Sequence, residues 1–295
     1  MIKITKLGHL SLQTRDVERL VAHYVDVLDF SEIDRGPDGT VYLSTDPGHH
    51  SLAITPAGDA RLDRIAMQVD AGSLDDVAAE LERNGLPAER RSDPEPGVPD
   101  LIATTDNEGN ALHLYATKAG DGDSRPATAR PQKLGHVCYF VEDVGASVAF
   151  YERVFNFRWS DWIGDFFVFL RCGPEHHTLN LLKSPKNHRL HHIGYEVRDW
   201  AHVQLAVDRL GMHEVPLAWG PGRHGPGHNV FTYHRDPDGN VVELFCELDL
   251  MLDESIGAFD PRPWHKDSPQ RPKVWGPGPL VPNAWGPPPP EGFLE

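Results

Sequence analysis

The sequence of 295 residues has little of what marks secreted or membrane-spanning proteins. Its three cysteines, Cys138, Cys172 and Cys246, are odd in number and widely spaced, so they suggest no disulfide framework and fit a reducing cytoplasm. No apolar run approaches the roughly 18 residues that a membrane span needs. The N-terminus lacks the apolar segment of a secretory signal. We therefore expect a cytoplasmic protein without a membrane anchor.

Positive charge is also scarce. The chain has 28 Lys and Arg residues against 44 Asp and Glu residues, which gives a formal net charge of −16. Phosphate backbones and anionic membrane surfaces repel such a chain, so neither nucleic acid nor a membrane is an expected partner. Hydrophobic residues make up 39% of the sequence, which allows a packed core. The length predicts about two domains.

Common nucleotide-binding and nucleophile motifs are missing. The sequence has no G-x-x-x-x-G-K-[ST], Cys-x-x-Cys or G-x-S-x-G element. Residues 220–225 fit G-x-G-x-x-G literally, but a predicted strand over 230–233 follows them where a dinucleotide site needs a helix. We interpret these residues as a flexible loop that carries His224. Histidine, by contrast, is abundant, and 17 histidines in so acidic a chain hint at metal or proton chemistry.

An internal repeat organises the chain. Residues 8–30 and 135–157 align at an offset of 127, which pairs Gly8-His9 with Gly135-His136. The block that starts at Arg61 matches the block from Arg189 at an offset of 128, and residues 106–115 match 236–245 at an offset of 130. An offset that drifts by so little indicates two copies of one module.

Each copy has the same pattern of expected elements. A strand comes first, then a helix that spans 17–28 in the first copy, with Asp16 as its N-cap. Strands over 40–45 and 51–55 follow, then another strand and a second helix. Ser73 and Asp76 form a capping-box pattern at the start of that helix, and Gly85 and Gly211 are expected to end it in the two copies. Each half is therefore predicted to be βαβββ twice over.

Composition sets the expected boundaries. We predict an N-terminal module over 1–118, a polar linker over 119–133, a C-terminal module over 134–252 and a tail over 253–295. The tail holds 11 of the 26 prolines, so it is expected to form neither helix nor strand. Its tryptophans, Trp264, Trp275 and Trp285, predict that it packs over the C-terminal barrel mouth or onto a neighbouring subunit.

The repeat also compares the chemistry of its two copies. The aligned pairs at three strand positions are His9 and His136, Arg64 and His192, and His113 and Glu243. Only the second copy offers two histidines and a carboxylate, because arginine cannot ligate a metal cation. That set matches the facial triad of non-haem Fe(II) oxygenases, and Mn(II) accepts the same ligands. Taken singly, His136 and His192 could instead be hydrogen-bonded strand histidines, and Glu243 could be a capping residue.

Three motifs carry a resemblance to a known family. They are GHVCYFVEDV from residue 135, RLHHIGYEV from residue 189 and GPGRHGPGHNVFTYHRDPDGNVVELFCELD from residue 220. Residues 4 to about 250 resemble the type I extradiol ring-cleavage dioxygenases of the vicinal oxygen chelate superfamily, close to catechol 2,3-dioxygenase. The resemblance implies an α+β fold of tandem paired βαβββ modules in two open barrels, with iron held by His136, His192 and Glu243. It also implies a homo-oligomer.

Further residues are assigned by the same resemblance. His177 takes the place of a catalytic second-sphere histidine fifteen residues before His192, although Thr178 follows it where the family usually has Asp. His224 and Tyr233 match residues that contact the bound catecholate, and we place His228 with them. The structural alternatives are a strand histidine, loop histidines and a barrel-lining tyrosine.

The implied reaction is extradiol cleavage of a catechol-type diol by O₂, giving a 2-hydroxymuconic semialdehyde-type product. His224 and Tyr233 would orient the substrate, and His177 would donate a proton as the ring opens. Two other functions remain open for this fold. One is a glyoxalase-like metal-dependent isomerase or lyase, which Arg64 disfavours because such enzymes commonly combine ligands from both modules. The other is a non-catalytic module of the bleomycin-resistance type.

Overall fold

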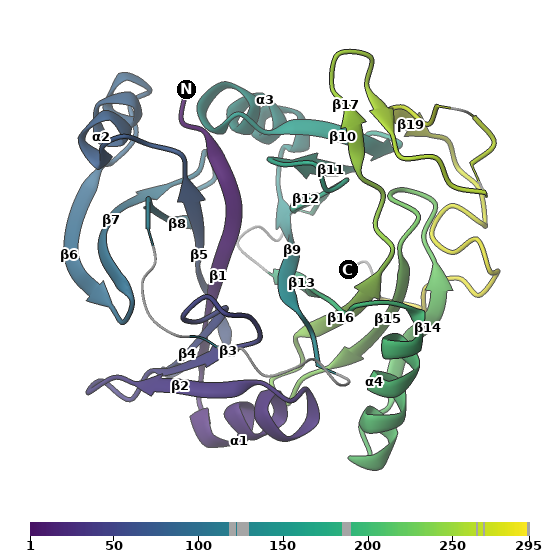
Figure 1. Ribbon diagram of the computed structural model, residues 1–295, viewed down its shortest axis with the longest axis horizontal. Helices are drawn as coiled ribbons and strands as arrows, with labels where there is room; N and C mark the ends of the chain where they lie inside the picture. The colour runs from purple at the N-terminus through teal and green to yellow at the C-terminus, as the bar shows by residue number, and fades with distance from the viewer. Residues whose placement is uncertain (118–121, 123–129, 185–189, 264, 268, 294–295) are drawn as a thin grey trace.

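The computed structural model describes residues 1–117, 122, 130–184, 190–263, 265–267 and 269–293. Here the chain forms two curled sheets that lie side by side, one from each half of the sequence (Figure 1). Each sheet is built from two βαβββ units. The predicted α+β fold of tandem paired modules is confirmed.

The first sheet has eight strands in the order β2-β3-β4-β1-β5-β8-β7-β6. They are β1 (Ile4–Thr14), β2 (Ser31–Arg35), β3 (Val41–Ser44), β4 (Leu52–Pro56), β5 (Arg61–Val69), β6 (Glu89–Glu95), β7 (Val98–Thr105) and β8 (Ala111–Tyr115). β1 is antiparallel to β5, and this pair joins the two units at the centre of the sheet. The predicted strands over 40–45 and 51–55 correspond to β3 and β4.

The second sheet has nine strands in the order β14-β15-β16-β13-β9-β12-β11-β10-β19. They are β9 (Lys133–Val141), β10 (Arg158–Ile163), β11 (Phe167–Arg171), β12 (Leu179–Lys183), β13 (Leu190–Glu196), β14 (Leu217–Arg223), β15 (Val230–Arg235), β16 (Val241–Cys246) and β19 (Lys273–Trp275). β13 lies between β9 and β16, so these three strands present neighbouring side chains to the concave face.

The helices are α1 (Val17–Ala22), η1 (His23–Val27), α2 (Leu74–Arg83), α3 (Val144–Phe155) and α4 (Trp200–Met212). Asp16 caps α1 as predicted, but the expected continuous helix over 17–28 changes to a π-helix at His23. Ser73 caps α2 by accepting a hydrogen bond from the amide of Asp75. Gly85 follows α2 in the left-handed region (φ 72°), as a terminating glycine should.

Two sequence predictions about local structure in the second module are wrong. Gly211 does not end its helix but lies inside α4, and the left-handed residue is Glu214 (φ 58°). Pro216 follows two residues later and cannot continue a helix, which accounts for the end of α4 without a glycine. Residues 220–223 are not a loop, because they pair with β15 as the last part of β14.

The two modules contact each other through equivalent residues. The Asp-x-x-Gly-Asn turn of the second module places Asp236 Oδ2 3.3 Å from the hydroxyl of Tyr24 in the first. Reciprocally, Tyr151 of the second module donates to Asp106 of the first at 3.1 Å. These residues are buried and match in the repeat, so their conservation between the two copies has a structural reason.

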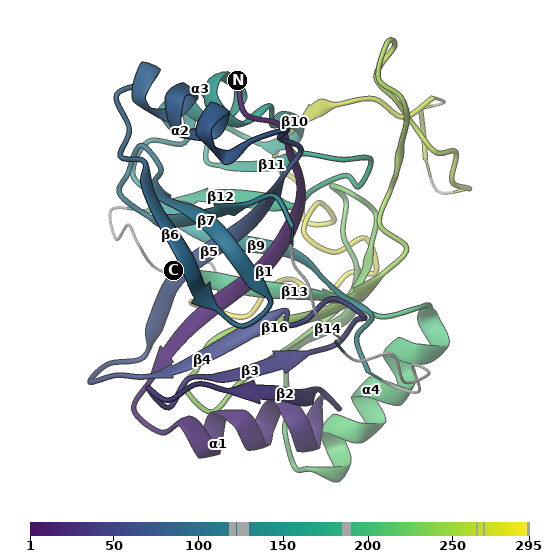
Figure 2. The ribbon, with the colours of Figure 1, turned by 60° about the vertical axis from the view of Figure 1, so that its left-hand side comes forward.

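The tail follows the second sheet, and in both ribbon views the yellow segment lies beside that sheet (Figures 1 and 2). Contrary to expectation it contains short strands: β18 (Ala258–Phe259) forms a hairpin with β17 (Met251–Asp253), which lies at the boundary of the tail, and β19 pairs in parallel with β10 at the sheet edge. An edge position tolerates flanking prolines such as Pro272, because one side of the strand needs no ladder hydrogen bonds. Trp264 lies outside the described residues.

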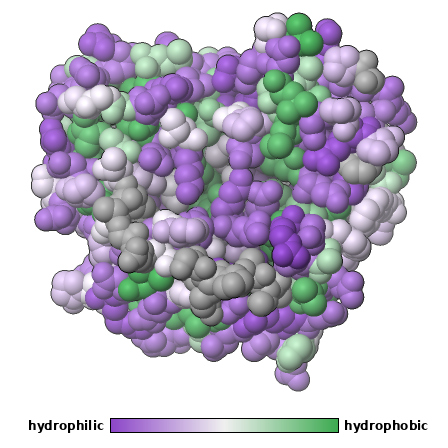
Figure 3. Space-filling view, viewed as in Figure 1, coloured by the Kyte–Doolittle hydropathy of each residue, from purple (hydrophilic) through white to green (hydrophobic). Residues whose placement is uncertain are grey.

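Hydrophilic side chains cover most of the face in Figure 3. Within the described residues, no helix is both long and apolar enough to cross a membrane.

Candidate active site

Three side chains converge on the concave face of the second sheet: His136 on β9, His192 on β13 and Glu243 on β16. The Nε2 atoms of the two histidines lie 3.0 Å apart. Glu243 Oε2 lies 2.9 Å from His136 Nε2 and 3.4 Å from His192 Nε2. All three residues are buried. Two imidazole nitrogens and one carboxylate oxygen at one point fit a divalent metal with open coordination positions.

Gly194 makes room for this arrangement. In the strand register it lies between Glu243 on one side and His136 on the other. A Cβ atom at this position would overlap the His136 ring. The glycine in RLHHIGYEV is therefore required by the close approach of an imidazole rather than by backbone conformation.

Glu243 is held by partners besides the histidines. Asn229 Nδ2 donates to Glu243 Oε1 at 2.9 Å, and the Tyr233 hydroxyl donates to Oε2 at 3.0 Å. Burial alone would raise the pKa of Glu243, but His136, His224 and Tyr233 bring it below its usual value, so the carboxylate is charged. Sequence reasoning missed Asn229. Its signal was the two-residue period that places it on the same face as Tyr233.

His177 lies against the His136 ring, with ring centroids 4.6 Å apart. Its Nδ1 atom is 3.0 Å from Nδ1 of His176, and His176 Nε2 is 3.1 Å from the fully buried Asp161. Burial, with His136 and His176 adding to it, lowers the pKa of His177 well below its usual value. His176 and Asp161 thus hold the His177 imidazole in place. Thr178, which stands where the family usually has Asp, has no carboxylate that could do so.

His224 and Tyr233 meet on the other side of the site. His224 Nε2 is 2.9 Å from the Tyr233 hydroxyl, and its ring stacks on Phe231 at a centroid distance of 3.8 Å. Burial lowers the pKa of His224 and raises that of Tyr233 well above its usual value. One neutral imidazole and one neutral phenol therefore face the pocket.

His228 is not with the other predicted site residues. Its Nδ1 atom lies 2.7 Å from Asp249 Oδ2, and His265 of the tail contacts the same oxygen at 3.2 Å. The backbone of His228 is left-handed (φ 51°), which turns its side chain toward the tail instead of the pocket. His228 therefore does not join His224 and Tyr233, as the predicted substrate contact required.

A pocket connects the remaining residues. His136, His177, His192, His224, Tyr233 and Glu243 all line it. Its apolar wall consists of Ile163, Phe166, Phe167, Phe169 and Trp219 from the second module and Val281, Pro282, Pro289 and Phe293 from the tail. Among the described lining residues there is no lysine or arginine. The tail thus covers the mouth of the second barrel, one of the two placements that its tryptophans predicted.

The first module has a different cluster at the aligned positions. Glu95, which sequence reasoning missed because it lies outside the aligned blocks, places Oε1 3.0 Å from His9 Nε2 and Oε2 3.3 Å from Arg64 Nη2. His113, with its pKa lowered to about 4 by burial and by Arg64, is nearby. His9, His50 and Glu95 bring ligand atoms within 4.8 Å of one another, but the guanidinium already neutralises the carboxylate.

Two histidines and a carboxylate on adjacent strands form a candidate mononuclear metal site inside a duplicated α+β fold. Residues 6–114 and 133–244 match the model of the Glyoxalase/Bleomycin resistance protein/Dioxygenase superfamily. The chain belongs to this superfamily.

Known relatives show which group of this superfamily the chain resembles. The chain is 27% identical to the manganese-dependent 2,3-dihydroxybiphenyl 1,2-dioxygenase of Geobacillus genomosp. 3, over 92% of this chain and 94% of that protein. It is 26% identical to an iron-dependent extradiol dioxygenase of Rhodococcus jostii, over 86% and 93%. The Mn(II)-bound glyoxalase from Novosphingobium aromaticivorans superposes with a TM-score of 0.86 at 26% identity, covering 99% of this chain and 94% of that one. By sequence, the chain groups with the extradiol dioxygenases, as its motifs predicted.

Proposed function

We propose that this protein is an extradiol dioxygenase that opens the ring of a catechol-type diol with O₂, in the breakdown of aromatic compounds. The metal is Fe(II), and the ligand set accepts Mn(II) as well. The main support for this proposal is one observation. His136, His192 and Glu243 meet in one pocket with His177 and Tyr233. Both atoms of O₂ enter a 2-hydroxymuconic semialdehyde-type product.

Each side chain has a role in this proposal. His136, His192 and Glu243 hold the metal, which when bound acidifies a coordinated hydroxyl and brings diol and O₂ together. The neutral His224 imidazole and the Tyr233 hydroxyl hydrogen-bond the diol oxygens and fix the ring. His177 takes up and returns a proton beside the metal, a role that suits an imidazole kept neutral by burial.

The pocket supports an uncharged substrate. Its wall is aromatic and aliphatic, and its described residues include no cation that could pair with a carboxylate on the ring. The net charge of −16 also repels anionic substrates. We therefore propose a diol that carries an apolar substituent or none.

We also propose a division of labour along the chain. Residues 1–118 form a module without metal, 119–133 a linker, 134–252 the catalytic module and 253–295 a cover for the pocket. The three cysteines are unpaired and buried, which supports a reducing, cytoplasmic location. We also propose that the protein is a homo-oligomer and that it has no nucleic-acid or membrane partner. Measurement of its mass in solution tests the oligomeric state.

Anaerobic loading with Fe(II), followed by addition of O₂ and a panel of catechols, tests the activity. We expect a yellow ring-opened product and one O₂ consumed per diol. The panel should include alkyl- and aryl-substituted catechols beside carboxylated ones. If no diol is opened by either the Fe(II) or the Mn(II) form, the proposed activity is wrong. Cleavage of carboxylated catechols alone would instead refute only the substrate class.

The likeness to a solved glyoxalase raises a second candidate, a metal-dependent isomerase acting on glutathione adducts. Such a substrate carries several charges, whereas the described pocket lining contains no lysine or arginine. Conversion of a glutathione hemithioacetal without O₂ would support this candidate, and inertness toward it would leave the dioxygenase.

A further inference from the structure

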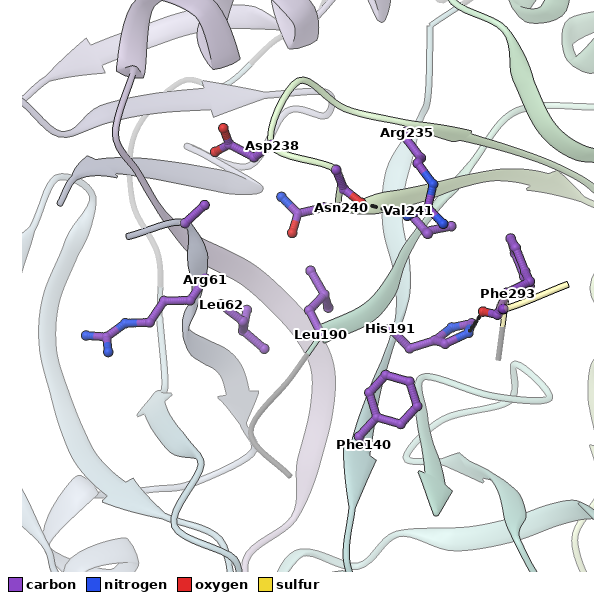
Figure 4. Close-up of a pocket in the computed structure, with 13 residues that line it drawn as sticks. Arg61, Leu62, Phe140, Leu190, His191, Arg235, Asp238, Asn240, Val241 and Phe293 are labelled. Carbon is purple, nitrogen blue, oxygen red and sulfur yellow. Dashed lines mark hydrogen bonds between the residues drawn. The ribbon is translucent and has the colours of Figure 1, made fainter. Parts of the chain in front are cut away.

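The end of the tail contacts a histidine next to a candidate metal ligand. His191 Nε2 lies 2.8 Å from the carbonyl oxygen of Phe293, and both residues are buried. Figure 4 shows the imidazole pointing along this hydrogen bond, beside a polar pocket between the modules. On its other side, His191 Nδ1 lies 2.6 Å from Nδ1 of His192.

These two contacts determine where the protons lie. A carbonyl oxygen only accepts, so His191 Nε2 must carry a proton and donate it. Of the two facing Nδ1 atoms one must donate and the other accept, and the arrangement that satisfies both contacts of an uncharged His191 ring has its Nδ1 accepting from Nδ1–H of His192. Nε2 of His192 is left with a free lone pair, and this is the atom that faces His136 and Glu243.

A second tail carbonyl acts on the other side of the pocket. Pro282 O lies 2.6 Å from Nδ1 of His224, so this nitrogen donates and Nε2 is left as an acceptor beside the Tyr233 hydroxyl. Both carbonyls lie beyond residue 244, where the match to the superfamily model ends.

We infer that the tail is a positioning element for the active site. Its Phe293 and Pro282 carbonyls set the tautomers and ring orientations of His192, through His191, and of His224. This inference rests on the proposed metal role of His192. The first module has Asp63 at the position that aligns with His191. The hydrogen bond from this position to the tail is therefore a feature of the second module. Loss of a partner that orients a metal-bound histidine typically weakens metal affinity 10- to 100-fold.

Mn(II) titration of the metal-free full-length protein is the test, because it needs no turnover. We compare deletion of residues 290–295, His191→Leu and the two combined. Each change should weaken Mn(II) binding about tenfold or more. The combination should cost no more than His191→Leu alone, because both changes break one chain of hydrogen bonds. Glu291→Ala changes an exposed side chain of the same segment, keeps Phe293 and its carbonyl, and is the matched control, with unchanged Mn(II) affinity.

A rescue variant separates positioning from general damage. His191→Asp introduces the residue of the first module, whose carboxylate accepts from His192 Nδ1–H without help from the tail. In this background the 290–295 deletion should leave Mn(II) affinity within about twofold, since the orienting partner of His192 no longer involves the tail. In labelled metal-free protein, ¹⁵N resonances should report a protonated His192 Nδ1, and a mixture of tautomers after His191→Leu.

Several outcomes would overturn the inference. They are unchanged Mn(II) affinity in His191→Leu, additive losses in the combined variant, or a protonated Nε2 in His192 of the intact protein. If the deletion fails to fold, His191→Leu in the full chain decides the question. Failure of the proposed metal site would look different, because Mn(II) would then bind equally well to Glu243→Ala.

Discussion

The two modules share one backbone plan but balance a buried carboxylate in opposite ways. In the first, Glu95 pairs with Arg64 and His9, so a cation of the chain itself neutralises it. In the second, Glu243 faces His136 and His192, and the alignment places no arginine among them. A buried carboxylate with no lysine or arginine beside it suits a further positive charge. The difference teaches that a self-contained ion pair and a site that suits a metal are separated by two aligned strand positions, Arg64 against His192 and His113 against Glu243, together with Glu95 from outside the alignment.

A second difference concerns space. Gly194 leaves room for the His136 ring, whereas the aligned residue of the first module is Ala66, which lies between His9 and His113 in the register. Charge and volume therefore change together between the copies. Each difference can be reversed singly, and the following experiments do so.

Removal of a metal ligand should have the largest effect. Glu243→Ala should weaken Mn(II) and Fe(II) binding by more than about 100-fold and abolish ring opening, because one of three ligands is gone. The matched control is His113→Ala at the aligned position, which should leave about one tightly held ion per chain. Elemental analysis after gel filtration measures both. Two ions per chain in the unmodified protein would reveal a second site, at the His9 cluster or at His228, Asp249 and His265.

His177→Phe separates chemistry from binding. Ring opening should slow by about 10²–10⁴-fold if His177 transfers protons, while metal affinity changes little. His50, its counterpart in the first module, provides the control: His50→Phe should leave turnover within about twofold. Single-turnover kinetics with preloaded metal make the comparison. Equal losses in the two variants would assign both histidines to structure.

Exchange of the small residues tests the role of space. Gly194→Ala should push the His136 ring out of position and weaken Mn(II) binding about 10- to 100-fold. Ala66→Gly, the reverse change, should leave binding intact and lower the free energy of unfolding by about 0.5–1 kcal/mol, the usual cost of glycine in a strand. Titration and chemical denaturation give the two quantities. Normal metal affinity in Gly194→Ala would contradict the steric argument.

Arg64→Leu tests the internal ion pair. Glu95 is buried and has a lowered pKa, because burial, which raises it, is outweighed by His9 and Arg64. Loss of the guanidinium should cost about 2 kcal/mol of unfolding free energy, somewhat less than a fully buried pair because Arg64 is 19% exposed. Arg90→Leu breaks an exposed ion pair with Asp75 and should change stability by less than about 1 kcal/mol.

The last effect concerns pH. His23 and His234 meet between the modules, with Nε2 atoms 3.3 Å apart, and burial lowers their pKa values to about 4 and about 3. The unfolded chain takes up protons below about pH 6.5 while the folded pair stays neutral. Stability should therefore be full above pH 7 and fall by about 1–2 kcal/mol per histidine toward pH 5.

The aligned residues Phe150 and Thr104 cannot titrate in this range, which gives two matched variants. His23→Phe and His234→Thr should each flatten the dependence of melting temperature on pH between 7 and 5. An unchanged slope in both variants would assign the acid sensitivity of the protein to other groups.

Local chemistry explains why some predictions from the sequence held and others did not. Asp16 and Ser73 cap helices because a short polar side chain next to a helix start has an obvious amide partner. Gly211 misled, because glycine can also lie inside a helix when a later residue takes the left-handed conformation. The Pro-rich tail was expected to lack strands, but Val274 and its neighbours pair at an open sheet edge, which the sequence of the tail does not reveal.

The sequence by itself determined the duplication, the βαβββ plan and the superfamily, and it singled out His136, His192 and Glu243. Those features follow from periodicity, from the spacing of the repeat and from the difference between its copies, all of which are local or can be aligned. Only the tertiary structure decided that Arg64 pairs with Glu95 in the first module, that Asn229 holds Glu243 and that His228 turns away from the pocket. It also placed the tail carbonyls against His191 and His224. These contacts join residues far apart in the chain, or depend on which way a side chain turns. Neither can be predicted from the pattern of a single sequence.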